Sequence, residues 1–145
     1  MFSKTTEYAL RATIYLAQKS SVHNKLGIEA IAKAIDSPIP FTAKILQLLA
    51  KDSTLVSSTR GPHGGFYMSE EAKQLPALTV LKATGEENVI TKCVLGLHRC
   101  TDNKPCPMHW QYKEIKLQLI HLFENNSIIS LANDTSRETA FIRNR

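Results

Sequence analysis

Apolar residues recur at helical spacing in three segments near the start of the chain. Residues 4–18 form the first predicted helix, and Ser3 is placed to cap it. A second helix is predicted from the i, i+3, i+4, i+7 spacing of four apolar residues, Ile28, Ile31, Ala32 and Ile35. Pro38 ends that helix, and Pro40 suits the first turn of a third. The apolar side of the third helix is predicted to consist of Phe41, Ile45, Leu48 and Leu49.

The second and third predicted helices are short and joined by a tight turn, which is typical of a helix-turn-helix motif. In that motif the second helix enters the major groove of DNA. We expect the opposite, polar side of this helix to contact bases or phosphates through Thr42, Lys44, Gln47 and Lys51. A polar row of this kind also occurs on ordinary solvent-exposed helices, so the row alone does not establish DNA binding.

A predicted hairpin downstream adds to the DNA-binding interpretation. Residues 55–59 and 66–68 are typical of two short strands, and the segment 60–65 between them is rich in turn residues. A hairpin placed after the second helix of the motif makes it a winged helix. We expect Arg60 at the hinge of the wing and His63 at its tip to reach phosphates or a minor groove.

A longer helix is predicted near the end of the chain. A short helix is expected at about 79–84, and Pro107 then opens the long one. Its apolar residues are spaced four, three, four and three apart, which is the two-heptad pattern of a helix that packs against a partner helix. They are Met108, Tyr112, Ile115, Leu119 and Leu122, called the seam below. Little of the chain remains to cover the seam, so dimerisation is predicted.

These patterns predict a mainly α-helical fold with a small β wing and four segments. They are a winged helix-turn-helix unit (1–84), a cysteine-rich loop (85–106), a dimerisation helix with a short following helix (107–132) and a flexible tail (133–145). The formal net charge of +5 suits a polyanionic partner such as double-stranded DNA. No run of residues has the length and apolar character of a membrane span or a secretory leader, so a cytoplasmic location is expected.

All three cysteines of the chain, Cys93, Cys100 and Cys106, fall within fourteen positions, and His109 follows them. Thiolates and imidazole bind soft or borderline metals and iron–sulfur clusters. An odd number of cysteines favours such a role over a disulfide framework. A structural zinc site and a cluster-free thiol sensor are alternatives, although zinc sites usually contain a closer cysteine pair. No base for a nucleophilic cysteine is visible, so no enzyme is expected.

Several segments, taken in chain order, match one known family. They are Thr6-Glu7-Tyr8-Ala9-Leu10-Arg11 with Tyr15-Leu16-Ala17, Ile28-Glu29-Ala30-Ile31-Ala32, Lys44-Ile45-Leu46-Gln47-Leu48-Leu49 and the predicted hairpin from Ser58 to Phe66. With the cysteine loop and the long helix, residues 1 to about 132 resemble the iron–sulfur cluster regulators of the IscR and NsrR type, which are bacterial winged-helix transcription factors. Two features depart from the pattern. Six residues separate Cys93 from Cys100 where five are usual, and Asp52-Ser53-Thr54 replaces a glycine-containing turn.

The resemblance implies a homodimer whose long helices cross and which binds an imperfectly palindromic operator. It implies an iron–sulfur cluster on Cys93, Cys100 and Cys106, with 2Fe–2S favoured over 4Fe–4S. The fourth ligand in such proteins is a histidine just after the third cysteine, which His109 matches, or an acidic residue of the partner's first helix, with which Glu7 aligns. The implied function is a transcriptional regulator whose operator affinity follows redox state, nitric oxide or iron–sulfur status. The alternative is a cluster-independent regulator with a zinc-binding or thiol-sensing loop.

Overall fold

The computed structural model describes residues 1–51, 55–136 and 141–143. Asp52-Ser53-Thr54, where the sequence departs from the glycine-containing turn of the family pattern, therefore lies outside the described residues. The elements in chain order are α1 (Lys4–Lys19), α2 (Ile28–Ile35), α3 (Ile39–Ala50), β1 (Ser57–Thr59), β2 (Gly65–Tyr67), α4 (Glu70–Lys73), α5 (Leu78–Thr84), the 3-10 helix η1 (Glu87–Ile90), α6 (His109–Glu124) and α7 (Ile128–Ser136). The predicted mainly α-helical fold with a small β wing is confirmed. None of the helices in the described ranges is long and apolar enough to cross a membrane.

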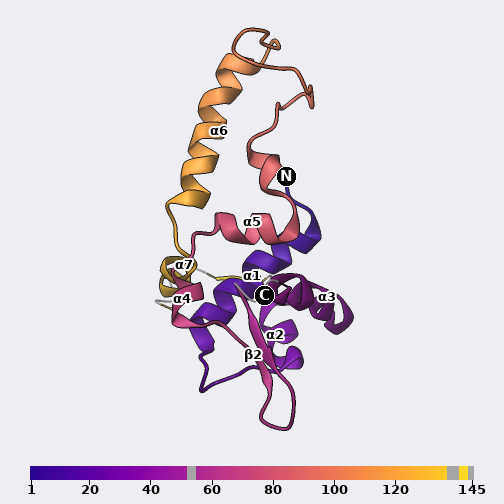
Figure 1. Cartoon of the computed structure of the whole chain (residues 1–145), viewed down its shortest axis with the longest axis vertical. Coiled ribbons are helices and arrows are strands. Elements are labelled where there is room, and N and C mark those ends of the chain that lie inside the picture. Colours follow the sequence, from indigo (N-terminus) through magenta and orange to yellow (C-terminus); the bar gives the residue numbers. More distant parts are fainter. Residues whose placement is uncertain (52–54, 137–140, 144–145) are drawn as a thin grey trace.

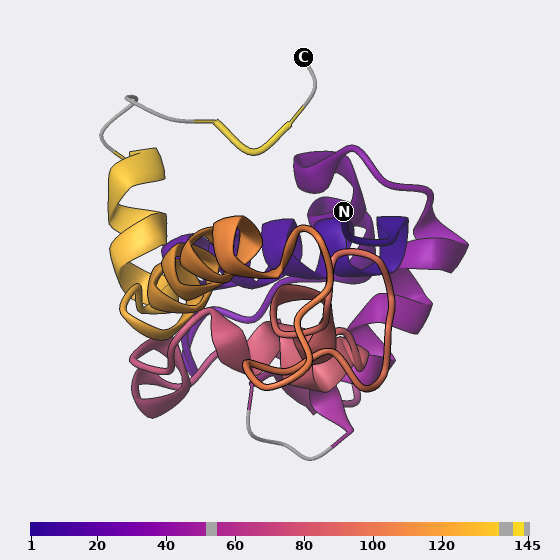
Figure 2. The same cartoon turned by 90° about the horizontal axis from the view of Figure 1, so that it is seen from above.

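Helix α1 is the centre of the fold. Ser3 caps it as predicted, because the Ser3 Oγ accepts a hydrogen bond from the Thr6 N–H at 3.3 Å. The helix packs against α2, α3, α5 and α7, and Figure 2 shows α7 on one side of α1 with α2 and α3 on the other. Small buried side chains at Ala9 and Ala12 allow this close approach of several helices. Larger buried side chains complete the core, among them Leu16, Ile31, Ile35, Ile45, Leu46, Leu49, Met68, Val80 and Ile128.

The two helices of the predicted motif are present, but the buried side of α3 differs from the prediction. The residues buried on α3 are Thr42, Ile45, Leu46 and Leu49, which are themselves spaced i, i+3, i+4 and i+7. Leu48, which was predicted to be buried, is 39% exposed, and Leu46 is fully buried instead. Thr42 can occupy the first buried position because its hydroxyl donates to the Pro38 carbonyl oxygen at 2.9 Å.

The wing is an antiparallel hairpin in which Ser57, Ser58 and Thr59 lie opposite Tyr67, Phe66 and Gly65. A Cβ atom on Gly64 would lie 2.2 Å from the Thr59 carbonyl oxygen, so this turn requires a glycine. The hairpin is attached to the body by a pair of backbone hydrogen bonds between Leu26 and Phe66, of 2.9 and 2.8 Å. The first strand is shorter than predicted, because residues 55–56 turn into the core before it begins.

Helix α6 extends away from the body and carries the cysteine loop at its far end (Figure 1). It begins at His109, two residues later than the predicted opening at Pro107, and it packs mainly against α5 and η1. The chain then returns through α7, which packs against α1 and not along the seam. Helix α7 continues to Ser136, so the first residues of the predicted flexible tail are helical. Residues 137–140 and 144–145 of that tail lie outside the described residues.

Candidate metal centre

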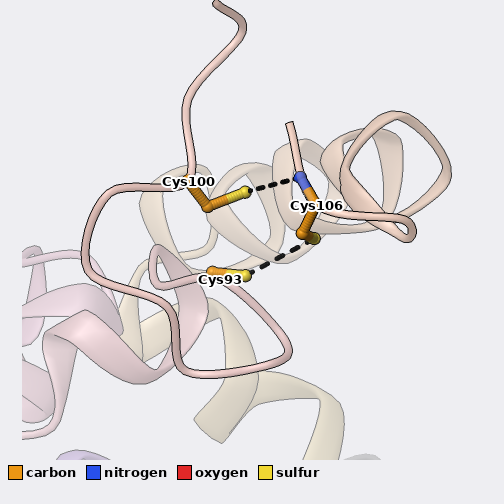
Figure 3. A group of neighbouring side chains, drawn as sticks. All are labelled: Cys93, Cys100 and Cys106. Carbon is orange, nitrogen blue, oxygen red and sulfur yellow. Dashed lines mark hydrogen bonds between the residues drawn. The ribbon is translucent and has the colours of Figure 1, made fainter. Parts of the chain in front are cut away.

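The three cysteines meet in the loop between η1 and α6, as their spacing suggested. Their Sγ atoms all lie within 4.8 Å of one another, and all three thiols are free of disulfides. The Sγ of Cys93 lies 3.7 Å from the Sγ of Cys106, and the backbone N–H of Cys106 donates to the Sγ of Cys100 at 3.4 Å (Figure 3). Cys106 is buried, whereas the other two are half-buried. The loop therefore gathers three soft ligands at one point.

His109 lies beside this group, and one of its two ring nitrogens is close to Cys100. The Nδ1 atom lies 3.2 Å from the Sγ of Cys100, and His109 as a whole residue is 9% exposed. The other nitrogen, Nε2, lies 2.7 Å from Oδ1 of Asp102, and Lys113 donates to Oδ2 of the same carboxylate at 2.7 Å. Hydrogen bonds from Lys113 and then from His109 lower the pKa of Asp102, so this carboxylate is ionised at neutral pH.

The backbone around Cys93 favours its thiolate form. A hydrogen bond from the backbone N–H of Leu97, followed by one from Leu95, lowers the pKa of the Cys93 thiol to about 7, although partial burial acts in the opposite direction. The Cys106 N–H acts on Cys100 in the same way, but burial and the neighbouring thiols of Cys106 and Cys93 outweigh it, and the pKa of Cys100 is raised. Cys93 is therefore more readily deprotonated than Cys100 in the absence of a metal.

Cys106 lies three residues before His109, the first residue of α6. The charged residues flanking the ligands, Lys92, Arg99 and Lys104, are exposed. A shallow hollow beside the ligands is lined by Leu97, His98, Arg99, Cys100, Lys104, Pro105 and Cys106. The side chains of Lys92, Arg99 and Lys104 can partly offset the negative charge of three thiolates while remaining in contact with water.

Glu7, the alternative fourth ligand, is not part of the cysteine group of its own chain. It lies on α1, where Lys4 pairs with it at 3.3 Å between Nζ and Oε1.

The predicted DNA contacts lie on the half of the molecule away from the cysteine loop, where α2, α3 and the wing are found (Figure 1). Lys44, Gln47 and Lys51 are exposed on or just after α3, and Arg60 and His63 are exposed on the wing. Thr42 is fully buried, so its expected place on the exposed face is wrong.

The family model of Rrf2, described as iron-dependent transcriptional regulators, matches residues 2–134. This chain belongs to the Rrf2 family. A protein of Aquifex aeolicus that is named an HTH-type transcriptional regulator is 33% identical to this chain over 135 residues. These residues make up 92% of this chain and 92% of the relative. The regulator IscR of Klebsiella pneumoniae is 24% identical over 127 residues, which are 88% of this chain and 76% of IscR. These relatives belong to a family of non-enzymatic transcriptional regulators, which implies that the Rrf2-family chain binds DNA and is not an enzyme.

Solved structures share the fold of this Rrf2-family chain. CymR, the global cysteine regulator of B. subtilis, superimposes with a TM-score of 0.71 at 18% identity, over 92% of this chain and 96% of CymR. IscR of T. potens superimposes with a TM-score of 0.70 at 16% identity, over 97% of this chain and 91% of IscR. The winged-helix architecture with its long α6 is therefore that of known Rrf2-type regulators.

Asp102 contacts the candidate ligand His109, and Lys113 contacts Asp102, yet the sequence patterns of this Rrf2-family chain did not indicate either residue. Asp102 is one polar residue in a polar loop, and Lys113 lies eleven residues away on α6. No spacing rule connects the two, because the path of the loop brings them together. The only available signal was the position of Lys113 one helical turn after His109.

Proposed function

We propose that this protein is a dimeric DNA-binding regulator whose operator affinity is controlled by an iron–sulfur cluster held by Cys93, Cys100, Cys106 and His109. The observation that carries the proposal is the convergence of the three cysteine sulfur atoms, with His109 Nδ1 3.2 Å from one of them. The site lies at the start of a helix whose seam residues Met108, Ile115 and Leu122 are exposed in the described part of the chain. When bound, the cluster supplies a centre that oxidants, nitric oxide or iron shortage can alter or remove. The residues of the chain would convert that change into altered DNA binding.

The four ligands form two close pairs, which supports a 2Fe–2S cluster. One pair is Cys93 with Cys106, whose sulfur atoms are 3.7 Å apart. The other is Cys100 with His109, whose Sγ and Nδ1 atoms are 3.2 Å apart. Each iron of a 2Fe–2S cluster takes two protein ligands, whereas each iron of a 4Fe–4S cluster takes one. Two pairs of ligands therefore fit two irons better than four.

The exposed side of α6 supports the dimer. Three seam residues, Met108, Ile115 and Leu122, are 44%, 51% and 50% exposed. The remaining two, Tyr112 and Leu119, are half-buried. A continuous row of large apolar side chains in water is unfavourable, and burial against the same helix of a second copy would remove it.

The position of the ligands also supports control of DNA binding. The loop joins η1 to α6, so ligands held together in it would fix the start of α6 relative to η1. Helix α5 packs against η1, α1 and α3, and Glu86, just after α5, accepts hydrogen bonds from Ser3 and Thr6 at the start of α1. A change in the loop would thus alter how the two α3 helices of a dimer are separated. Half-sites on DNA lie about 34 Å apart, so a small change in that separation costs affinity.

The test is purification without oxygen, followed by an absorption spectrum and counts of iron and sulfide. The wild type should be coloured and contain both elements, and replacement of Cys93, Cys100 and Cys106 by alanine should abolish the colour and alter the affinity for an operator selected from random sequence. Asn103→Ala, an exposed change in the same loop, should leave both unchanged. Equal operator affinity of the wild type and the triple variant would show that the cluster does not control DNA binding.

The distance between Cys93 and Cys106 also favours a second candidate, a cluster-free thiol sensor. The 3.7 Å between their sulfur atoms and the Cys93 pKa of about 7 suit oxidation to a disulfide. Protein of this kind would be colourless and would contain no metal. A colourless protein with one bound zinc ion would instead indicate a structural zinc site.

A further inference from the structure

We propose that Asp102, held in place by Lys113, is a positioning residue that presents the Nδ1 atom of His109 to the metal. The proposal rests on the proposed ligand set of the loop. It adds two residues to the site and decides between the two candidates for the fourth ligand, because it makes the site complete within one chain. The partner's Glu7 would then not be needed.

The first step of the argument is the geometry around Asp102. Both oxygens of its carboxylate are used, one by His109 Nε2 and the other by Lys113 Nζ, each at 2.7 Å. An ionised carboxylate is only an acceptor, so the nitrogen that faces it must carry the hydrogen. With that hydrogen on Nε2, the Nδ1 atom of a neutral imidazole has a lone pair, and this atom faces Cys100 at 3.2 Å.

The second step is that the ring has little freedom to turn away. The His109 side chain is 8% exposed, and its ring meets the ring of Trp110 edge to face, with centroids 5.0 Å apart. Lys113, whose ammonium group also lies over the Trp110 ring at 5.4 Å, holds the carboxylate from the next turn of α6. The lysine, the carboxylate and the imidazole therefore form a chain of contacts that ends at the cysteines.

This arrangement has the form of a ligand with its supporting group. A histidine that binds a metal usually donates its other ring hydrogen to a carboxylate, which sets the orientation and the basicity of the ring, and loss of such a group typically weakens metal binding about 10–100-fold. The alternative is an ion pair that only stabilises the start of α6. Asp102 is 55% exposed and Lys113 is 38% exposed, so a purely structural pair would contribute little.

The experiment uses cobalt(II) as the probe, added to full-length protein that is reduced, free of clusters and kept without oxygen. Cobalt bound by three thiolates and one imidazole gives visible bands, and their energy changes when the nitrogen ligand is lost. We expect Asp102→Ala to weaken cobalt binding about 10–100-fold and to shift the bands. Asp102→Asn, which keeps an acceptor but loses the charge, should fall between wild type and Asp102→Ala. Asn103→Ala, an exposed change at the next position, serves as the control and should match wild type.

A double variant separates positioning from a structural role. If Asp102 acts only through His109, then Asp102→Ala combined with His109→Ala should bind cobalt as weakly as His109→Ala alone. Wild-type affinity and bands in Asp102→Ala, or additive losses in the double variant, would overturn the proposal. So would a wild-type protein that binds no cobalt.

The outcomes also distinguish this proposal from the proposed function. Cobalt binding that depends on Asp102, in a protein that never assembles a cluster, would support the positioning role and reject cluster sensing. A protein that assembles its cluster normally, and binds cobalt equally well without Asp102, would reject the positioning role alone.

Discussion

Two neighbouring positions on α3 give opposite predictions, and together they test how this helix is oriented. Thr42 is fully buried, and its hydroxyl donates to the Pro38 carbonyl oxygen at 2.9 Å and lies 3.0 Å from the Ser37 Oγ. Thr42→Val keeps the shape of the side chain and removes the donor. Lys44 is exposed on the same helix, and Lys44→Ala removes only a charge at the surface.

The expected magnitudes follow from these environments. Loss of one buried hydrogen bond costs about 1–2 kcal/mol of the free energy of unfolding. For a chain of this size, each kcal/mol lowers the melting temperature by about 2–4 °C. Thr42→Val should therefore lower it by about 2–8 °C and leave DNA affinity nearly unchanged. Lys44→Ala should change stability by less than about 0.5 kcal/mol. It should weaken DNA binding by on the order of 1–3 kcal/mol and reduce the slope of log affinity against log salt by about 0.9.

Stability is measured by thermal unfolding at one protein concentration, because a dimer unfolds in a concentration-dependent way. DNA affinity is measured by fluorescence anisotropy on a random-sequence duplex over a series of salt concentrations. Lys92→Ala in the cysteine loop removes the same charge from another exposed position and should leave the salt slope unchanged. A Thr42→Val protein of normal stability that binds DNA weakly would refute the buried position of Thr42. An unchanged salt slope in Lys44→Ala would show that Lys44 meets no phosphate.

Three further predictions test other parts of the structure. Glu86→Ala should destabilise the fold by about 1–2 kcal/mol at neutral pH, because this carboxylate accepts hydrogen bonds from Ser3 and Thr6. Those bonds, first from Ser3 and then from Thr6, lower the pKa of Glu86. The difference in the free energy of unfolding between wild type and variant, measured with urea, should therefore shrink as the pH falls through that lowered pKa. A difference that stays constant with pH would contradict this. In reduced, cluster-free protein, Cys93 should react with iodoacetamide faster than Cys100, with a midpoint near pH 7 in peptide mass spectra; equal rates would argue against a stabilised thiolate. Leu122→Glu on the seam should yield a monomer in light scattering. Leu117 is 58% exposed on the other side of α6, so Leu117→Glu should stay dimeric. The reverse result would place the interface on the other face of the helix.

The periodic and local features of this protein could be predicted from its sequence. The presence of α1 and α2, the Ser3 cap and the hairpin all depend on residues close together in the chain, and each was found, with α1 one residue longer and the first strand shorter than expected. The gathering of the three thiols was also predictable, because every cysteine of the chain falls within fourteen positions, a clustering typical of a shared ligand site.

Only the tertiary structure decided which residues of a given pattern do which task. Thr42 and Leu46 are buried and Leu48 is exposed because neighbouring helices, and not helical spacing alone, set how α3 is turned about its axis. Asp102 meets His109 and Lys113 because the loop folds back over the start of α6, a path that no local rule specifies. Helical periodicity depends on the backbone of a few residues, whereas the phase of a buried stripe and the partners of a loop carboxylate depend on the whole packed chain.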